Sequence, residues 1–570
     1  MRNGLLMMMC AALLGVAACS NDNSGPTKRV SPDGKTMGIE SDATATHVAY
    51  VLGATPAFGT TGELHLADNT GKDIKLATGV SVGGYFFSPN GKSFLYTVAN
   101  MGADDASLNW VDLSNPTAAP KVIMSGGLQT QPITPGTSAP TFTVPLLQQG
   151  FLSPSGRFYI FGVLAPMVSV SPDMHVVDLD TGTDVFVKEN GAFDYLELVL
   201  PNDVMVYQDA VGGNDGIAGG AGVQTLFWVD LTSGSPTPTP IATRTGAYSP
   251  TGDNKSIVYH DADTRELYVW DAVARPATGT KVASNALTFA VGQSGPIVYI
   301  GTDKAASGAG QSLHVVGLDG KAILDLSADT AKADIFSPLY ISDDGADIYY
   351  FQTVATQNGQ GTLMHVAGTA GATPAKIADS ASLGDVRVLP GGVLLYLANV
   401  DGLGVAGDAF KSARDGSGAV ALGTRVPVGF LTVQTPAEGM ANAKTDWVSA
   451  HLFGTMENKD QKLADEVRAI VGGLELTTTT GNAMVDPAVR IGQYQVSDDL
   501  ANIVWVSGGA FDSLVDNYVG SLEWAPVATP SMKPMAPLLT GVTEVGPVAG
   551  KKLFVNAPKA STPGVYFVSF

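Results

Sequence analysis

Two groups of acidic residues have the residue types and the close spacing that could bind a metal ion. The first group is Asp178, Asp180 and Asp184, and the second is Asp261, Asp263 and Glu266. Carboxylate oxygens are the ligands that Ca²⁺ prefers. Neither group completes an EF-hand loop, and both fit solvated hairpin turns better. We therefore expect no metal site and keep these six residues only as weak candidates for Ca²⁺.

Four of the seven histidines fall at one position of a recurring pattern, and that position is filled by Asn, Phe or Tyr in other copies. These histidines are His65, His175, His314 and His365. Equivalent positions in separate repeats lie tens of residues apart, and no pair has the His-x-x-x-His spacing of a metal site. We expect them to be core residues.

Other chemical motifs are incomplete. Residues 402–407 read Gly-Leu-Gly-Val-Ala-Gly, which matches G-x-G-x-x-G, but the polar stretch that follows does not predict the helix that a dinucleotide site needs. The chain has no G-x-S-x-G and no H-E-x-x-H motif. The sequence thus predicts no catalytic residue, no cofactor and no enzymatic activity.

The recurring pattern predicts strands. Each copy has Leu or Met, a variable residue, two mostly apolar residues, and then Asp or a small residue. The copies occupy 64–68, 108–112, 174–178, 226–230, 267–271, 313–317 and 364–368. Their spacing suits the blades of a propeller with insertions.

A turn rich in Ser, Pro, Asp and Gly comes before many of these strands, and a β-branched or aromatic strand follows it. The turns begin at Ser88, Ser153, Ser249, Ser342 and Ser497. Such residues favour tight turns because Pro presets φ and Gly accepts a positive φ. Each repeat therefore predicts an antiparallel sheet of four consecutive strands.

This turn and the apolar strand after it resemble the TolB/PD40 (WD40-like) repeat, which implies a β-propeller. We expect an all-β chain of about eleven four-stranded antiparallel blades. Two propellers, over 36–285 and 286–570, are the preferred arrangement, and one large ring is the alternative. The last unit lacks an outer strand, which residues 28–30 or 36–39 could supply. Leu463, Val467 and Ile470 have helical spacing and predict a short helix near 457–470.

The N-terminal segment has the features of an export signal. Arg2 is followed by an apolar stretch over 4–14 that is too short to span a bilayer. The sequence Val16-Ala17-Ala18-Cys19 resembles the bacterial lipobox. The resemblance implies a signal peptide over 1–18, diacylglycerol and an added acyl chain such as palmitate on Cys19, and a lipidated tether over 19–35. The alternative is a secreted protein cut near Ala18.

Composition limits the class of partner. The chain has 32 basic and 53 acidic residues in 570, a net charge of −21. Nucleic acid binding needs a cationic surface, so we exclude it. The cysteines are Cys10 and Cys19 alone, and removal of the signal leaves no pair for an internal disulfide.

The sequence is compatible with two functions. The first is a non-catalytic scaffold of the cell envelope that is anchored to the membrane by lipid and binds a protein or glycan. Ser20 resembles the residue after the lipobox Cys in outer-membrane lipoproteins, which implies an outer-membrane location facing the periplasm or the cell surface. The second is an envelope glycan hydrolase or lyase whose carboxylates line a central channel.

Overall fold

The computed structural model describes twenty segments of the chain. They are residues 27–53, 61–98, 107–125, 151–163, 173–188, 198–200, 202–210, 224–292, 295–301, 312–326, 335–342, 344–355, 359–389, 392–429, 432–434, 448–458, 468–478, 482–512, 517–530 and 536–570. Within these segments the regular elements are strands, and none is a helix. The prediction of an all-β chain is confirmed.

The strands of the first part of the chain form five blades. Blade 1 has β2 (Thr36–Ser41), β3 (His47–Leu52), β4 (Thr61–Asp68) and β5 (Asp73–Ser81); blade 2 has β6 (Tyr85–Phe87), β7 (Ser93–Val98), β8 (Ser107–Asp112) and β9 (Lys121–Ser125). Blade 3 has β10 (Phe151–Leu152), β11 (Phe158–Val163), β12 (Asp173–Asp178) and β13 (Thr183–Lys188). Blades 4 and 5 share one seven-stranded sheet of β14 (Leu198–Val199), β15 (Val204–Ala210), β16 (Gln224–Asp230), β17 (Thr239–Pro250), β18 (Ser256–Asp261), β19 (Leu267–Asp271) and β20 (Thr280–Ala283).

The remaining strands follow the same order. Blade 6 has β21 (Ala286–Val291), β22 (Ile297–Gly301), β23 (Ser312–Val316) and β24 (Ala322–Asp325); blade 7 has β25 (Ile335–Ile341), β26 (Asp347–Ala355), β27 (Gln360–Ala367) and β28 (Ala375–Ser382). Blade 8 has β29 (Val386–Leu389), β30 (Val393–Ala398), β31 (Ala406–Ala413) and β32 (Val420–Pro427). Blades 9 and 10 share β33 (Thr432–Gln434), β34 (Val448–Asn458), β35 (Arg468–Thr478), β36 (Asn482–Val496), β37 (Asn502–Asp512), β38 (Asn517–Pro526) and β39 (Leu539–Val542). Blade 11 has β40 (Glu544–Val545), β41 (Lys552–Ala557), β42 (Gly564–Ser569) and β1 (Thr27–Arg29).

Two long strands explain the seven-stranded sheets. In β17, residues up to Thr245 pair with β16, whereas residues from Thr245 onward pair with β18. Strand β36 divides in the same way between β35 and β37. Each of these strands is the last strand of one blade and the first strand of the next, so each seven-stranded sheet contributes two blades to the eleven defined above.

The core lies between blades. The second strand of a blade is apolar on both faces, as in β3, where Val48 to Val51 are all buried. Ala49 and Val51 of blade 1 share one hydrophobic cluster with Phe94 and Val111 of blade 2. The other face of β3, through Val48 and Tyr50, packs with Phe554 of blade 11. A blade therefore needs a neighbour on each side to bury its apolar surface.

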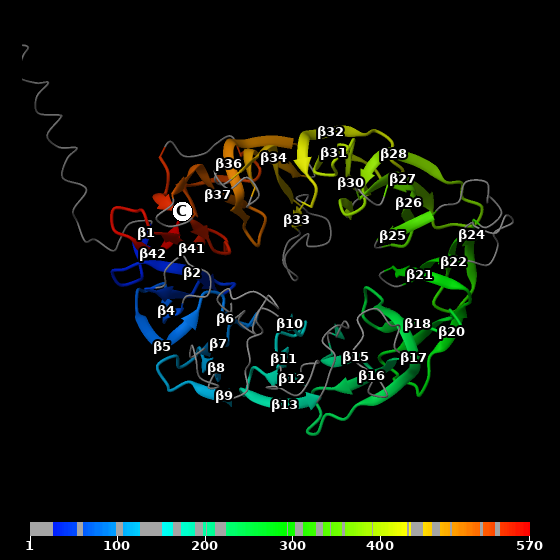
Figure 1. Ribbon diagram of the computed structural model, residues 1–570, viewed down its shortest axis with the longest axis horizontal. Helices are drawn as coiled ribbons and strands as arrows, with labels where there is room; N and C mark the ends of the chain where they lie inside the picture. The colour runs from blue at the N-terminus through cyan, green and yellow to red at the C-terminus, as the bar shows by residue number, and fades with distance from the viewer. Residues whose placement is uncertain are drawn as a thin grey trace, which may run out of the picture.

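The blades follow one another in chain order around a single ring (Figure 1). Strand β17 contacts β21 across the expected boundary at residues 285 and 286, and β2 of blade 1 contacts β41 of blade 11. The ring therefore closes once, between the first and the last blade. The preference for two propellers is wrong, and the alternative of one large ring describes the arrangement.

The expected helix near 457–470 is also wrong at both of its ends. Glu457 and Asn458 belong to β34 and pair with Ala469 and Arg468 of β35. Helical spacing in a short apolar segment is also compatible with a strand, and pairing within the sheet decided between the two. Residues 459–467 lie outside the described part of the chain.

The two ends of each blade differ. The connections from the first to the second strand and from the third to the fourth strand lie at one end, which we call the turn end. The connections from the second to the third strand, and from one blade to the next, lie at the opposite end, which we call the loop end. This arrangement follows from the antiparallel order of the strands.

Strand β1 completes the last blade. Thr27, Lys28 and Arg29 pair with Val568, Phe567 and Tyr566 of β42. The sequence offered residues 28–30 or 36–39 as the source of this missing strand. The structure uses Thr27–Arg29, which overlaps the first of these, and residues 36–39 belong instead to β2 of blade 1. Without β1, the edge of β42 would be left unpaired.

A buried polar network stabilises the contact between blade 11 and blade 1, which we call the seam. The Asn556 side chain accepts a hydrogen bond from Thr36 Oγ1 at 2.7 Å and donates to the Thr36 carbonyl at 3.0 Å and to Glu544 Oε2 at 3.3 Å. The amide of Ile39 also donates to Glu544, at 3.3 Å. Burial raises the pKa of Glu544 above its usual value. These bonds join blade 11 to the first strand of blade 1.

We expect Asn556→Leu to weaken the seam. The substitution leaves the buried Thr36 hydroxyl without its acceptor and removes one of the donors to Glu544, at a cost of about 2–4 kcal/mol. Hydrogen exchange measured by mass spectrometry should become faster in peptides covering β1 and β42, and the melting temperature should fall. Exposed Asn115→Leu is the control, and equal behaviour of the two variants would contradict the role of Asn556.

Candidate functional site

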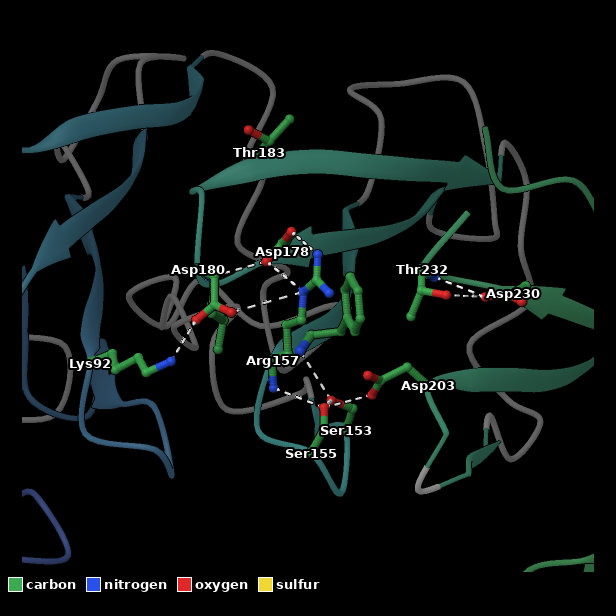
Figure 2. A network of polar contacts seen from close by, with 12 residues as sticks. Lys92, Ser153, Ser155, Arg157, Asp178, Asp180, Thr183, Asp203, Asp230 and Thr232 are labelled. Atoms are coloured by element: carbon green, nitrogen blue, oxygen red, sulfur yellow. Dashed lines mark hydrogen bonds and ion pairs between the residues drawn. The ribbon is translucent and has the colours of Figure 1, made fainter. Parts of the chain in front are cut away.

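A polar network at the turn end of blades 2, 3 and 4 contains two of the six predicted acidic residues, Asp178 and Asp180 (Figure 2). Among the described residues it is the strongest candidate for a site, because charged side chains from three blades meet there. The hydrogen bonds and ion pairs of these side chains show the role of each one.

The turn serines act through buried hydroxyl groups. Ser153 Oγ accepts a hydrogen bond from the Phe158 amide at 3.0 Å and lies 3.0 Å from Ser155 Oγ. Ser155 Oγ in turn accepts from the Arg157 amide at 3.1 Å. The hydroxyl therefore ties the start of the second strand to the turn, five residues back in the chain.

The same arrangement recurs in four other blades. In each, a hydroxyl accepts from the amide five residues later and donates to the side chain two residues later. The hydroxyls belong to Ser88, Thr251, Ser342 and Ser497. The predicted turn at Ser249 is therefore displaced by two residues, because Ser249 and Pro250 still belong to β17 and Thr251 takes the serine's place.

Asp344, in the turn of blade 7, shows the electrostatic effect of this turn. The Ser342 hydroxyl at 2.6 Å, together with the Arg414 guanidinium at 2.5 Å, lowers the pKa of Asp344 to about 2. Arg414 belongs to blade 8, so this ion pair also links two blades.

The first acidic group does not converge on one point. Asp178 receives Arg157 Nη2 at 2.9 Å and Nε at 3.3 Å, while Asp180 lies 3.7 Å from Lys92 Nζ. Figure 2 shows the Arg157 guanidinium directed at Asp178. Asp184 is engaged elsewhere, with His175 Nδ1 at 2.7 Å. Two of these carboxylates are therefore matched by basic side chains, and the third by a histidine.

The network also connects neighbouring blades. Ser155 Oγ donates to Asp203 of blade 4 at 2.6 Å. On the other side, Trp110 Nε1 of blade 2 donates to the Leu179 carbonyl at 2.7 Å. Gly182 has φ +60°, and a Cβ at this position would lie 3.0 Å from the Trp110 ring. The turn of blade 3 is thus fitted closely to blade 2.

The second acidic group lies at the loop end, opposite to the first. Asp261 accepts the amides of Asp263 and Thr264 at 3.0 and 2.8 Å, which caps the turn between β18 and β19. Arg244 binds Asp263 and lowers its pKa. Lys281 binds Glu266 and is the main cause of its lowered pKa. The carboxylates of Asp263 and Glu266 thus each face a different basic side chain.

The four histidines lie in the third strands of blades 1, 3, 6 and 7, as expected of repeat positions. Each stacks on or tilts against an aromatic ring directly opposite it in the second strand, and each lies close to an Asp of its own blade. The ring pairs are Tyr50–His65, Phe161–His175, Tyr299–His314 and Tyr349–His365; the aspartates are Asp73, Asp184, Asp325 and Asp347.

Blade 1 has the most elaborate of these pairs. His65 Nδ1 lies 2.8 Å from Asp73 Oδ2, and the Tyr50 hydroxyl donates to Asp73 Oδ1 at 2.5 Å. Glu63 lies 3.6 Å from the other ring nitrogen of His65. Burial opposes the charge on His65, but Asp73 and Glu63 outweigh it and raise the pKa of this imidazole above its usual value.

Sequence reasoning missed the partners of these groups. The aromatic residue opposite each histidine could have been found by aligning the second strands, in which Tyr50, Phe161, Tyr299 and Tyr349 occupy this position. The pairing of Arg157 with Asp178 gives no local signal because 21 residues separate them.

Several predictions fall outside what the structure describes. Cys19 and the signal peptide lie in residues 1–26, which precede the first described segment. Among the described residues, no group of three or more His, Cys, Asp or Glu side chains is arranged to hold a metal ion. The same part of the chain has no helix long and apolar enough to cross a membrane.

Comparison with known proteins gives no match to any protein-family model and none to any curated protein. Solved structures do match. A eukaryotic initiation factor is 9% identical, with a TM-score of 0.37, and the match covers 70% of this chain and 91% of that one. TolB from Acinetobacter baumannii is 19% identical with a TM-score of 0.21, covering 50% and 64%. The β-propeller domain of the Trilobed protease from Pyrococcus furiosus is 11% identical with a TM-score of 0.24, covering 69% and 99%.

These similarities are weak, and the assignment of the fold rests on the sheets described above. TolB, the family whose repeat the turns resemble, is among the structures to which this chain is similar.

We expect Ser153→Ala to destabilise the protein by about 1–3 kcal/mol, because the buried Phe158 amide loses its hydroxyl acceptor. Ser153→Thr should restore most of the loss, since Thr251 performs the same role in blade 5. Thermal unfolding measures the effect. Exposed Ser114→Ala is the control, and a loss no larger than that of this control would contradict the account.

We expect the contribution of His65 to depend on pH. Its folded-state pKa is raised, so its stabilising effect is complete below the unfolded-state pKa of about 6.5 and is lost as pH rises through the folded-state pKa. His65→Gln should therefore lower the melting temperature more at pH 5.5 than at pH 8. A difference that is independent of pH would count against this ion pair.

Proposed function

We propose that this chain is a lipid-anchored β-propeller of the bacterial cell envelope that binds a protein or glycan partner without catalysing a reaction. The single observation that carries the non-catalytic role is the engagement of the described acidic candidates. Each is matched by a basic or histidine side chain or caps a turn, and the histidines pair within their own blades. These contacts account for the groups as parts of the fold.

The envelope location rests on the N-terminal sequence. The lipobox resemblance at Val16–Cys19 follows an apolar stretch of signal-peptide length. Two or three acyl chains on Cys19 would give stable anchoring. We infer an outer-membrane lipoprotein from Ser20, with the propeller facing the periplasm or the cell surface.

A glycan hydrolase or lyase is the alternative. Such an enzyme needs two carboxylates, one of them with a raised pKa. Desolvation raises the pKa of Glu40 and of Glu544, and both lie on the first strands of adjacent blades. However, Glu544 accepts hydrogen bonds from Ile39 and Asn556 across the seam, which gives it a structural role. We therefore favour binding.

The anchor is tested with the full-length chain expressed in a Gram-negative host. We expect the N-terminal peptide of the mature protein to begin at Cys19 and to carry the added mass of diacylglycerol and an acyl chain. Cys19→Ala should move the protein from the membrane fraction to the soluble fraction. A wild-type protein that begins at residue 19 with an unmodified thiol would contradict the anchor.

The binding role is tested by crosslinking in the intact envelope, followed by purification of the full chain. We expect a defined protein or glycan to be captured, and the purified chain to leave envelope glycan intact. Release of glycan fragments by the purified chain, lost on Glu40→Gln, would contradict the non-catalytic role and support the alternative.

A further inference from the structure

The position of Thr27 shows at which end of blade 11 the N-terminal segment joins the propeller. Thr27, the first described residue, pairs with Val568 near the end of β42. Lys552, the first residue of β41, pairs with Ser569 beside it. Thr27 therefore lies at the turn end of blade 11.

The chain between Cys19 and Thr27 is short. Eight residues can span at most about 29 Å when fully extended. A strand of six residues such as β41 is about 20 Å long. If Cys19 is in the bilayer, Thr27 at the turn end of blade 11 lies within about 29 Å of the lipid.

Charge supports the same orientation. Four lysines gather at the turn end of these two blades in a chain whose net charge is −21: Lys28, Lys72, Lys551 and Lys552. Lys72, Lys551 and Lys552 are exposed. Lys28 Nζ donates to the Thr70 carbonyl across the seam. We call these four residues the seam lysines.

Three acidic residues at the turn end of blade 1 are hydrogen-bonded within that blade, whereas Glu40 on β2 and Asp498 of blade 10 are exposed nearby. Asp42 accepts from the Thr46 amide at 2.7 Å, Asp68 from the Lys72 amide at 3.0 Å, and Asp73 from Tyr50 at 2.5 Å. These three carboxylates are therefore held within blade 1, while three of the seam lysines remain exposed. A cluster of lysines beside a membrane anchor is attracted to anionic headgroups.

We propose that the turn end of blades 1 and 11 lies against an anionic bilayer surface through the seam lysines, and that the loop end faces away from the membrane. This inference rests on the proposed lipid anchor at Cys19. It places the connections at the loop end, such as Asp261–Glu266 and Asn399–Val405, where a partner outside the membrane can reach them.

The test uses the full-length acylated chain in vesicles of phosphatidylethanolamine and phosphatidylglycerol that carry nitroxide-labelled headgroups. A fluorophore is attached to Thr70→Cys at the turn end or to Ser561→Cys at the loop end, both exposed positions. We expect quenching at residue 70 to be at least about twice that at residue 561, because strands about 20 Å long separate the two ends. Equal quenching, or stronger quenching at residue 561, would overturn the orientation.

Charge variants test the role of the seam lysines. On the Thr70→Cys background, combined Lys72→Glu, Lys551→Glu and Lys552→Glu should reduce the quenching at least by half while the protein stays in the membrane fraction. Lys35→Glu, an exposed lysine at the loop end, should leave it unchanged. Unchanged quenching in the triple variant would overturn the electrostatic contact.

The mass of the N-terminal peptide distinguishes failure of the proposed orientation from failure of the proposed lipid anchor. An unmodified Cys19 overturns both. A lipid-modified Cys19 without the expected difference in quenching overturns the orientation alone.

Discussion

Closure of the ring is the constraint on which the rest of the structure depends. The second strand of a blade is apolar on both faces, so an isolated row of blades would expose one such face at each end. The chain resolves this by returning its N-terminal segment, Thr27–Arg29, to the edge of the last blade. One pairing thereby completes blade 11, covers the edge of β42 and brings the first and last blades into contact.

At the turn end, the same kind of contact recurs between neighbouring blades. The turn after the third strand of a blade rests on the outer part of the blade before it. Gly182 lies against Trp110, Gly416 against Ile377, and Gly71 against Lys28 across the seam. These glycines have positive φ, so they combine a tight turn with close approach to the neighbouring blade. The closing contact is therefore of the same kind as the others.

Much of the fold could be predicted from the sequence because it depends on local patterns. The serine turns and apolar strands defined the blade, and the lack of a fourth strand at the C-terminus pointed to residues 28–30 or 36–39. The pattern failed where distant residues decide the outcome. One ring or two depends on how the blades pack together, and the 457–470 segment had apolar spacing that fits either helix or strand.

Prediction of the candidate site was limited in the same way, by contacts between residues that are distant in the sequence. The acidic residues were visible as clusters, but their partners were not, because Arg157 reaches them from another turn and Arg244 from another strand. A carboxylate group near a turn can bind a cation or pair with a basic side chain, and only the three-dimensional arrangement distinguishes them. The repeat position of the histidines was informative because equivalent positions must share one environment in every blade.

The central claim is that all the blades form one ring closed by β1. Electron microscopy of the purified mature chain tests it most directly, through class averages of single particles viewed along the ring axis. The account predicts one closed ring, and a gap beside the last blade when residues up to Val30 are deleted. Particles with two separate smaller rings, one from each half of the chain, would contradict it.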